Sequence, residues 1–231
     1  MLSIIIPTYN EADTIIGLVT HLQENAQGKV NEIIVVDGHS TDNTLTLVKQ
    51  SGVKAIVAKE KGRAAQMNEG ASIATGEILY FVHADSFPPA SFVSDILDAV
   101  NKGYHLGCYR FKFRSNKLLL KFNSYCTRFD RLMCRGGDQT LFVKKEVFEE
   151  LNGYKNDYLI MEEYDFLIRA RKKYMFKIIP KDVLVSARKY DNNNYFRVNF
   201  ANFVVFMMFY AGVAQPKMVK TYKTLINHPK A

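Results

Sequence analysis

The chain has 231 residues, which is long enough for one hydrophobic core of ordinary size, and we expect a single domain. Hydrophobic residues make up 48% and charged residues 23% of the sequence, which excludes a largely disordered chain and a protein that crosses a membrane many times. The net charge of +8 favours a partner that carries negative charge.

The first part of the chain alternates between predicted strands and helices. Apolar, β-branched runs at 2–6 and 32–36 predict strands that are buried on both faces, as in a parallel sheet. Helical spacing follows at 11–25, and again after the capping residues 40–42 as far as Gly52. The same pattern continues with a strand at 54–58, a helix at 64–75 and a strand at 77–82. This order predicts an α/β fold.

The second part is less regular, and no linker or repeat separates it from the first. The expected elements are a helix at 91–102, a strand at 104–113, a long basic helix at 117–133, a strand that runs into a short helix within 138–154, a helix at 161–174 and a strand at 177–185. We expect two lobes of one unit, 1–103 and 104–190, followed by a helical tail, 191–231.

Positive charge is concentrated at 110–135. This segment has one acid, Asp130, and interleaves basic and aromatic residues: Arg110, Phe111, Lys112, Phe113, Arg114, Lys117, Lys121, Phe122, Tyr125, Arg128, Phe129, Arg131 and Arg135. The pattern is typical of a solvated helix face, or of a surface that meets lipid headgroups or a phosphorylated substrate. No nucleic-acid-binding motif is present, so we expect no nucleic acid partner.

Residues 198–216 carry no charge, and Asn199 and Asn202 interrupt their apolar character. We therefore expect a buried or interfacial helix, which either pairs two chains as a homodimer or makes a peripheral membrane contact. The N-terminus is not typical of a signal peptide, so we expect a cytoplasmic protein that reaches the inner face of the membrane if this helix meets lipid. The three cysteines lack CxxC spacing and are expected to be reduced and buried.

Polar residues cluster where three predicted strands end, at 8–11, 37–40 and 83–85. Ligands of parallel sheets bind at this edge. The sequence has neither a Walker A loop nor G-x-G-x-x-G after the first strand, which excludes the simplest P-loop and dinucleotide sites. Tyr9 is suited to stack on a base and Arg63 to meet phosphate. Asp85 is suited to hold a divalent cation whose other ligands come from a diphosphate.

Five blocks in order resemble the family 2 glycosyltransferases of GT-A fold, over about residues 2–185. They read "SIIIPTYNEADTI", "IIVVDGHSTDNT", "KGRAAQMNEGASIATGEILYFVHAD", "GGDQTLFVKKEVFEELNGY" and "MEEYDFLIRARK". The sequence is most similar to a small bacterial branch with His-Ala-Asp where most members carry Asp-x-Asp. The resemblance implies a mostly parallel central sheet flanked by helices, with a nucleotide-binding lobe at 1–103 and an acceptor lobe at 104–190.

The resemblance also implies roles for single residues. Asp85 matches the last aspartate of the metal motif, which implies Mg²⁺ or Mn²⁺, and His83 stands where the first aspartate faces the ribose. The positions that match nucleotide-binding residues are Pro7, Thr8, Tyr9, Glu11, Asp37, Arg63, Asn68, His83 and Ala84. Among them, Asp37 matches the carboxylate that bonds the edge of the base.

The acceptor side resembles the family at two places. The loop with Asp138 and Gln139 looks like the acceptor loop, and the Glu-Asp pair that holds the family's catalytic base is Glu162-Glu163 here. Glu163 therefore matches the base and Glu162 an acceptor-binding residue, while Glu162 and Asp165 are alternative bases. An acidic first turn is also what the helix dipole favours in any protein.

The resemblance implies an inverting hexosyltransferase with a UDP- or GDP-sugar donor, a divalent cation, and a sugar, lipid-linked or small-molecule acceptor. A nucleotidyltransferase is an alternative, although no Gly-rich, Lys-containing loop lies near residue 10. A catalytically silent protein that binds a sugar nucleotide or a membrane surface is another, because His83 and Glu163 are substitutions in the family pattern.

Overall fold

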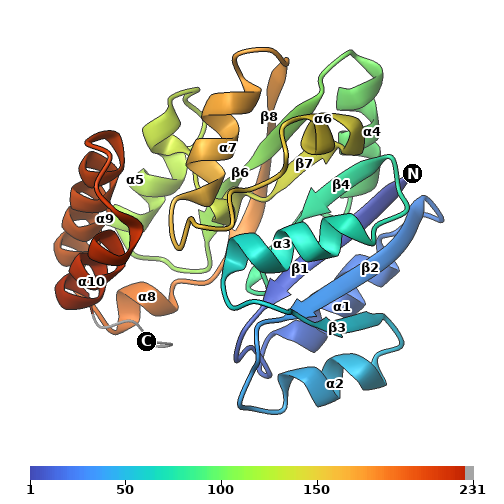
Figure 1. Ribbon diagram of the computed structural model, residues 1–231, viewed down its shortest axis with the longest axis horizontal. Coiled ribbons are helices and arrows are strands. Elements are labelled where there is room, and N and C mark those ends of the chain that lie inside the picture. The colour runs from blue at the N-terminus through green and yellow to red at the C-terminus, as the bar shows by residue number, and fades with distance from the viewer. Residues whose placement is uncertain (227–231) are drawn as a thin grey trace.

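The computed structural model describes residues 1–226, and among these an eight-stranded sheet runs through the molecule (Figure 1). The strand order is β3-β2-β1-β4-β7-β6-β8-β5. The strands are β1 (Leu2–Thr8), β2 (Val30–Asp37), β3 (Lys54–Val57), β4 (Ile78–Phe81), β5 (Ser86–Phe87), β6 (Leu106–Phe113), β7 (Leu141–Lys144) and β8 (Phe176–Val185). The first four of the order are parallel, β7 is antiparallel to both its neighbours, and β6 is parallel to β8.

Helices cover both faces of this sheet (Figure 1). They are α1 (Ile15–Glu24), α2 (Thr44–Gln50), α3 (Arg63–Ser72), α4 (Phe92–Asn101), α5 (Leu118–Cys126), α6 (Lys145–Glu150), α7 (Glu162–Ala170), α8 (Arg188–Asp191), α9 (Tyr195–Tyr210) and α10 (Gln215–Leu225), with 3-10 turns η1 (Leu132–Cys134) and η2 (Gly137–Gln139). One core lies under α1, α2 and α4, and the other under α3, α6 and α7.

The middle of strand β1 shows why three consecutive isoleucines are found there. Ile4 and Ile6 face the core under α1 and α4, whereas Ile5 between them faces the core under α3. Successive side chains of a strand point to opposite faces, so a strand covered on both sides needs no polar position. Gly70 lets α3 approach this strand, since a Cβ there would lie 2.5 Å from Ile5 Cγ2.

Each predicted strand and helix has a counterpart in the structure, but the helix at 117–133 was predicted too long. The structure ends α5 at Cys126 and continues in turns to η1. The buried guanidinium of Arg135 donates hydrogen bonds to the carbonyls of Thr127, at 2.5 Å, and Phe129, at 2.7 Å. In a continued helix these carbonyls would accept hydrogen bonds from backbone amides. Here the guanidinium of Arg135 is the donor instead.

The uncharged segment 198–216 is helical only as far as Tyr210 and reaches the start of a second helix at its end. Helix α9 ends at Tyr210, Gly212 follows with φ +68°, and α10 begins at Gln215. Within residues 1–226, no helix has both the length and the apolar character that crossing a bilayer requires. Of the three cysteines, Cys108 is buried as expected, whereas Cys126 and Cys134 are partly exposed.

Candidate active site

The carboxyl ends of β1, β2 and β4 meet at one edge of the sheet. Thr8 at the end of β1 pairs with Asp37 at the end of β2, and Ile5 pairs with Phe81 at the end of β4. The buried amide of Gln66 in α3 donates to the carbonyls of Thr8, at 2.8 Å, and Val36, at 2.7 Å. It thereby joins the first two strand ends, which is a role that the sequence analysis did not assign.

The loops after β1 and β2 hold one another. The amide of Asn10 donates to Ser40 Oγ at 2.9 Å, and the amide of Glu11 donates to Thr44 Oγ1 at 2.8 Å. Asp37, predicted to bond a base, is buried and accepts hydrogen bonds from the amide of Ser40 at 2.9 Å and its hydroxyl at 2.5 Å. In the ligand-free structure its carboxylate therefore orders its own loop. Tyr9 is 40% exposed beside these loops.

A cluster of alternating charges brings together residues that lie far apart in the sequence. Arg63, the first residue of α3, forms an ion pair through Nε with Glu162 Oε1, and its Nη2 lies 3.6 Å from Glu163 Oε2. Both glutamates begin α7. His83, which follows β4, lies with Nε2 3.3 Å from Glu163 Oε1 and with Nδ1 3.6 Å from Asp138 Oδ1 in η2. The predicted donor residues Arg63 and His83 thus contact the predicted acceptor residues.

The protonation states in this cluster follow from these contacts. Burial alone would raise the pKa of Glu163, but Arg63 and His83 outweigh it and lower this pKa to about 2. Burial alone would lower the pKa of His83, but Asp138 and Glu163 outweigh it and raise this pKa to about 9. Burial raises the pKa of Glu162, helped by Glu163 and opposed by Arg63. At neutral pH, Glu163 is therefore a carboxylate between two cations.

A second charged group lies next to the first and includes a residue that the sequence analysis missed. Arg188 Nη2 lies 3.1 Å and 2.9 Å from the two carboxylate oxygens of Glu11, and 3.6 Å from Asp85 Oδ2. Its position follows from the sheet, because Ser86 in β5 pairs with Val185 at the end of β8. A basic pair, Arg188-Lys189, separated by two residues from the end of a predicted strand, was the available signal in the sequence.

Asp85 has the properties of a single carboxylate ligand for a divalent cation. Burial and the neighbouring Asp138 and Glu11 raise its pKa, while His83 and Arg188 act in the opposite direction. Within residues 1–226, no three His, Cys, Asp or Glu side chains are grouped as metal ligands. The residues present fit Mg²⁺ or Mn²⁺ only with most ligands from a bound diphosphate, which is common for Mg²⁺ in nucleotide enzymes.

Gly137 allows η2 to approach the charged cluster. A Cβ on this residue would lie 2.2 Å from His83 Cε1 and 2.3 Å from Glu163 Oε1, so any larger side chain would displace both groups. The backbone nearby is also strained: Thr140 has φ +58° with ψ 162°, and Met161, directly before α7, has φ +66°. Left-handed conformations of such residues are costly and concentrate at functional sites.

Several buried polar atoms of this cluster have no hydrogen bond. Among the described residues these are Glu162 Oε2 and the side-chain amide of Gln139, whereas Glu163 Oε1 has only its contact with His83 Nε2 at 3.3 Å. A cavity of about 20 Å³, enough for about one water molecule, is lined by Gln139 and Glu163. Because a buried polar group without a partner is costly, these atoms are suited to receive a ligand.

Other predicted site residues are not brought to the charged cluster. Asn68 donates through its amide to the carbonyl of Tyr154 at 2.7 Å and to Asn156 Oδ1 at 2.7 Å, and so connects α3 to the loop before α7. Pro7 is buried within β1, and Ala84 is buried in the loop that follows β4. Asp165, an alternative base, is paired with Lys155 at 2.8 Å and Arg169 at 2.7 Å.

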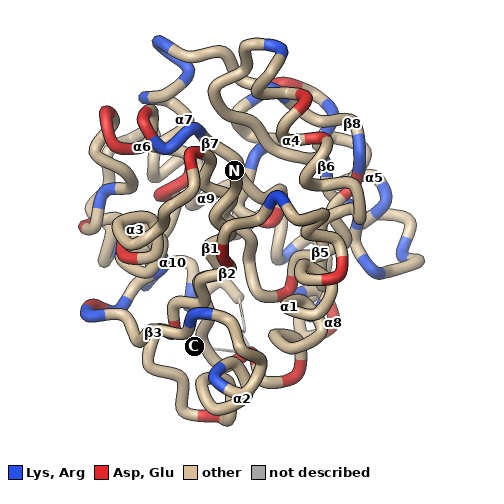
Figure 2. Tube along the Cα trace, turned by 90° about the vertical axis from the view of Figure 1, so that its right-hand side faces the viewer, with Lys and Arg blue, Asp and Glu red and all other residues tan. Residues whose placement is uncertain are grey.

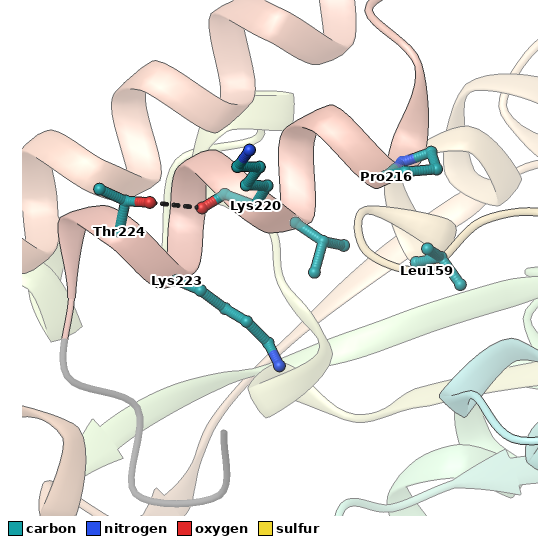
Figure 3. A pocket seen from close by; sticks show the side chains of 6 residues that line it. Leu159, Pro216, Lys220, Lys223 and Thr224 are labelled. Atoms are coloured by element: carbon teal, nitrogen blue, oxygen red, sulfur yellow. Dashed lines mark hydrogen bonds between the residues drawn. The ribbon is translucent and has the colours of Figure 1, made fainter.

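A surface hollow of about 490 Å³ lies between α10 and the loop that leads to Glu162 (Figure 3). Its lining consists of Leu159, Pro216, Val219, Lys220, Lys223 and Thr224. The two lysines point away from one another in Figure 3. Gln215 Oε1 accepts the amides of Leu159, at 3.0 Å, and Ile160, at 3.1 Å, so the start of α10 fixes this loop.

Comparison with known proteins gives matches over much of the chain. A family model described as "Glycosyl transferase family 2" matches residues 3–155. The dolichol-phosphate mannosyltransferase of Pyrococcus furiosus is 31% identical over 106 residues, which are 44% of this chain and 30% of that protein. The PGL/p-HBAD biosynthesis glycosyltransferase of Mycobacterium bovis is 28% identical over 190 residues, 74% of this chain and 69% of that one. The chain therefore spans less than a third of the archaeal protein.

The solved structures include the mannosyltransferase PcManGT from Pyrobaculum calidifontis in complex with GDP-Man and Mn²⁺. The similarity covers 97% of this chain and 69% of that one, with a TM-score of 0.66 and 21% sequence identity. The likeness confirms the predicted fold, a GT-A fold with a mostly parallel central sheet flanked by helices.

Proposed function

Because the chain belongs to the glycosyl transferase family 2, we propose that it moves a sugar from a nucleoside diphosphate donor to an acceptor hydroxyl with inversion at the anomeric carbon. The observation that carries this proposal is Glu163, a buried carboxylate that is ionised at neutral pH and lies at the start of α7 against the donor-side residues Arg63 and His83. A carboxylate in this position, between the two sets of predicted site residues, is placed to take the proton of an acceptor hydroxyl.

The donor is assigned to the strand ends of the first lobe, 1–103. The exposed ring of Tyr9 is suited to stack on the base, beside the loop that Asp37 orders. Arg188 supplies a guanidinium, the group best matched to phosphate oxygens, and Asp85 lies 3.6 Å from it. Mg²⁺ or Mn²⁺ held by Asp85 would offset the negative charge of the leaving diphosphate. The complex of PcManGT with GDP-Man and Mn²⁺ supports a nucleotide sugar and a cation.

The acceptor is assigned to the second lobe, 104–190, with Gln139 and Glu162 beside it. During transfer, the acceptor oxygen bonds to the anomeric carbon as the bond to the diphosphate breaks, and the hydroxyl proton passes to Glu163. Arg63 and His83 hold that carboxylate from two sides. Glu162 is less suited to be the base because Arg63 pairs with it directly. Asp165 is less suited because both of its oxygens accept hydrogen bonds, from Lys155 at 2.8 Å and from Arg169 at 2.7 Å. The two cations beside Glu163 lie farther from it, at 3.3 Å and 3.6 Å.

A panel of sugar nucleotides tests this function. We expect at least one of UDP-glucose, UDP-N-acetylglucosamine and GDP-mannose to release its nucleoside diphosphate slowly into water when Mn²⁺ is present, measured by coupled detection of the diphosphate. Release of pyrophosphate from a nucleoside triphosphate would indicate a nucleotidyltransferase instead. A rise in the melting temperature with a sugar nucleotide but no hydrolysis or transfer would indicate a silent binding protein.

A further inference from the structure

Helix α9 exposes an apolar stripe to solvent. Its members recur at turn spacing, are 51–69% exposed, and are Phe196, Phe200, Phe203, Met207 and Tyr210. The buried side of the helix is narrow and consists of Val198, Ala201 and Val205. A soluble helix normally has the reverse arrangement, with its wide apolar face turned to the core. Of the two expectations for this segment, a buried helix or an interfacial one, the exposed stripe agrees with the interfacial one.

Helix α5 and the turns after it expose a second stripe with the same spacing. It consists of Leu118, Phe122, Tyr125 and Phe129, which are 49–79% exposed. Asn123 connects the two helices, because its amide donates to Asn199 Oδ1 at 3.1 Å and its Oδ1 accepts from the hydroxyl of Tyr195 at 2.7 Å. Figure 1 shows α5 beside α9 at one end of the molecule. We call the two stripes together the α5/α9 face.

Basic residues flank the α5/α9 face. Lys117 lies directly before α5, Lys121 lies in its first turns, and Arg128 and Arg131 follow the helix. Within residues 1–226, Lys121, Arg128 and Arg131 form no ion pair with a carboxylate, whereas Lys117 pairs with Asp191 at 3.0 Å. In Figure 2, Lys and Arg positions gather along β8 and around α5. The face thus combines exposed aromatic side chains with uncompensated positive charge.

The positive charge on the α5/α9 face favours one of two partners, an anionic bilayer or a second copy of the chain. In a symmetric dimer the same patch meets itself, so Lys121 and Arg131 of one copy would approach the basic residues of the other. Like charges brought together at an interface oppose association. An anionic bilayer offers the complementary charge in its headgroups and an apolar layer beneath them, which is where amphipathic helices with basic flanks bind.

We propose that the α5/α9 face docks the protein on the surface of a bilayer that contains anionic lipid, without crossing it. The inner side of α9 packs on the active-site helix: the ring of Tyr164, the residue after Glu163, lies 5.8 Å from Phe206 and 6.2 Å from Phe209. Docking would therefore bring the start of α7 close to the headgroup layer. Docking through this exposed face does not require the proposed reaction.

Flotation with lipid vesicles tests the apolar part of the face. The full chain is expected to float with vesicles made of equal parts phosphatidylglycerol and phosphatidylcholine, and to bind pure phosphatidylcholine at least about tenfold more weakly. The double variant Phe122→Ser/Phe203→Ser should bind the anionic vesicles at least about tenfold more weakly than wild type, because it loses two aromatic anchors. The matched control Val57→Ser/Met175→Ser removes exposed apolar side chains elsewhere and should bind like wild type.

Charge reversal tests the basic part. Lys121→Glu/Arg131→Glu should weaken binding to anionic vesicles about tenfold or more, whereas Lys49→Glu/Lys102→Glu, which makes the same change in net charge on other faces, should have a much smaller effect. Circular dichroism melts would establish that each variant is folded. Equal binding by both charge variants would overturn the proposal. So would a lack of vesicle binding together with a wild-type dimer, seen in sedimentation velocity, that Phe122→Ser/Phe203→Ser dissociates.

Discussion

Replacing Glu163 by glutamine is expected to lower kcat for sugar transfer by about a thousandfold while leaving donor affinity within a few fold of wild type. Glutamine has the same shape and can still contact Arg63, but it cannot accept the proton of the acceptor hydroxyl. The loss should therefore appear in kcat and not in binding of the donor. The measurement is a steady-state transfer assay combined with calorimetric titration of the nucleoside diphosphate.

Two variants make the result for Glu163 specific. Glu163→Asp keeps a carboxylate and should retain more activity than Glu163→Gln, although its shorter side chain must reach the same proton. Glu146→Gln is the matched control, because Glu146 also lies in the first turn of a helix but is exposed on α6. Near-normal transfer by Glu163→Gln, with loss of transfer by Glu162→Gln, would assign the base to Glu162.

Replacing Asp85 by alanine is expected to reduce transfer by about a hundredfold to a thousandfold and to remove most of its dependence on Mn²⁺. The Asp85 carboxylate is the protein ligand that we assign to the cation. The single positive charge of Arg188 beside it cannot replace the two charges of the cation. The measurement is the transfer rate as a function of Mn²⁺ concentration.

The control for Asp85 is Asp98→Ala, which removes an exposed carboxylate from α4 and should change neither the rate nor its Mn²⁺ dependence. If Asp85→Ala kept both the wild-type rate and the wild-type response to Mn²⁺, the cation would not act through this residue. A fall in rate in Arg188→Ala of similar size would then indicate that the guanidinium carries the charge of the diphosphate.

The sheet could be predicted from the sequence because its signals are local. Runs such as 2–6 and 32–36 are apolar on both faces, which only strands covered by two layers of helices require. Parallel strands joined through helices must bring their carboxyl ends to one edge, so the meeting of Thr8 and Asp37 followed from strand order alone. The resemblance to known glycosyltransferases added the fold, which the structural likeness confirms.

The contacts that cross the chain could not be predicted in this way. Arg188 reaches Glu11 because β8 pairs with the short strand β5. No sequence pattern near residue 188 predicts that pairing. The chain leaves the helix after α5 where Arg135, from further along the sequence, donates hydrogen bonds to two backbone carbonyls. His83 was expected to face a ribose, but it lies between Glu163 and Asp138, and that placement rests on the close approach of Gly137.

The central claim is that the charged cluster around Glu163 and the group formed by Glu11, Asp85 and Arg188 are the acceptor side and the donor side of one active site. A crystal structure of the protein with UDP or GDP and Mn²⁺ tests it most directly. The account predicts a diphosphate within hydrogen-bonding distance of Arg188, with Mn²⁺ between it and Asp85 and the terminal phosphate directed toward Glu163. A nucleotide bound away from these strand ends, with Arg188 still paired to Glu11, would contradict it.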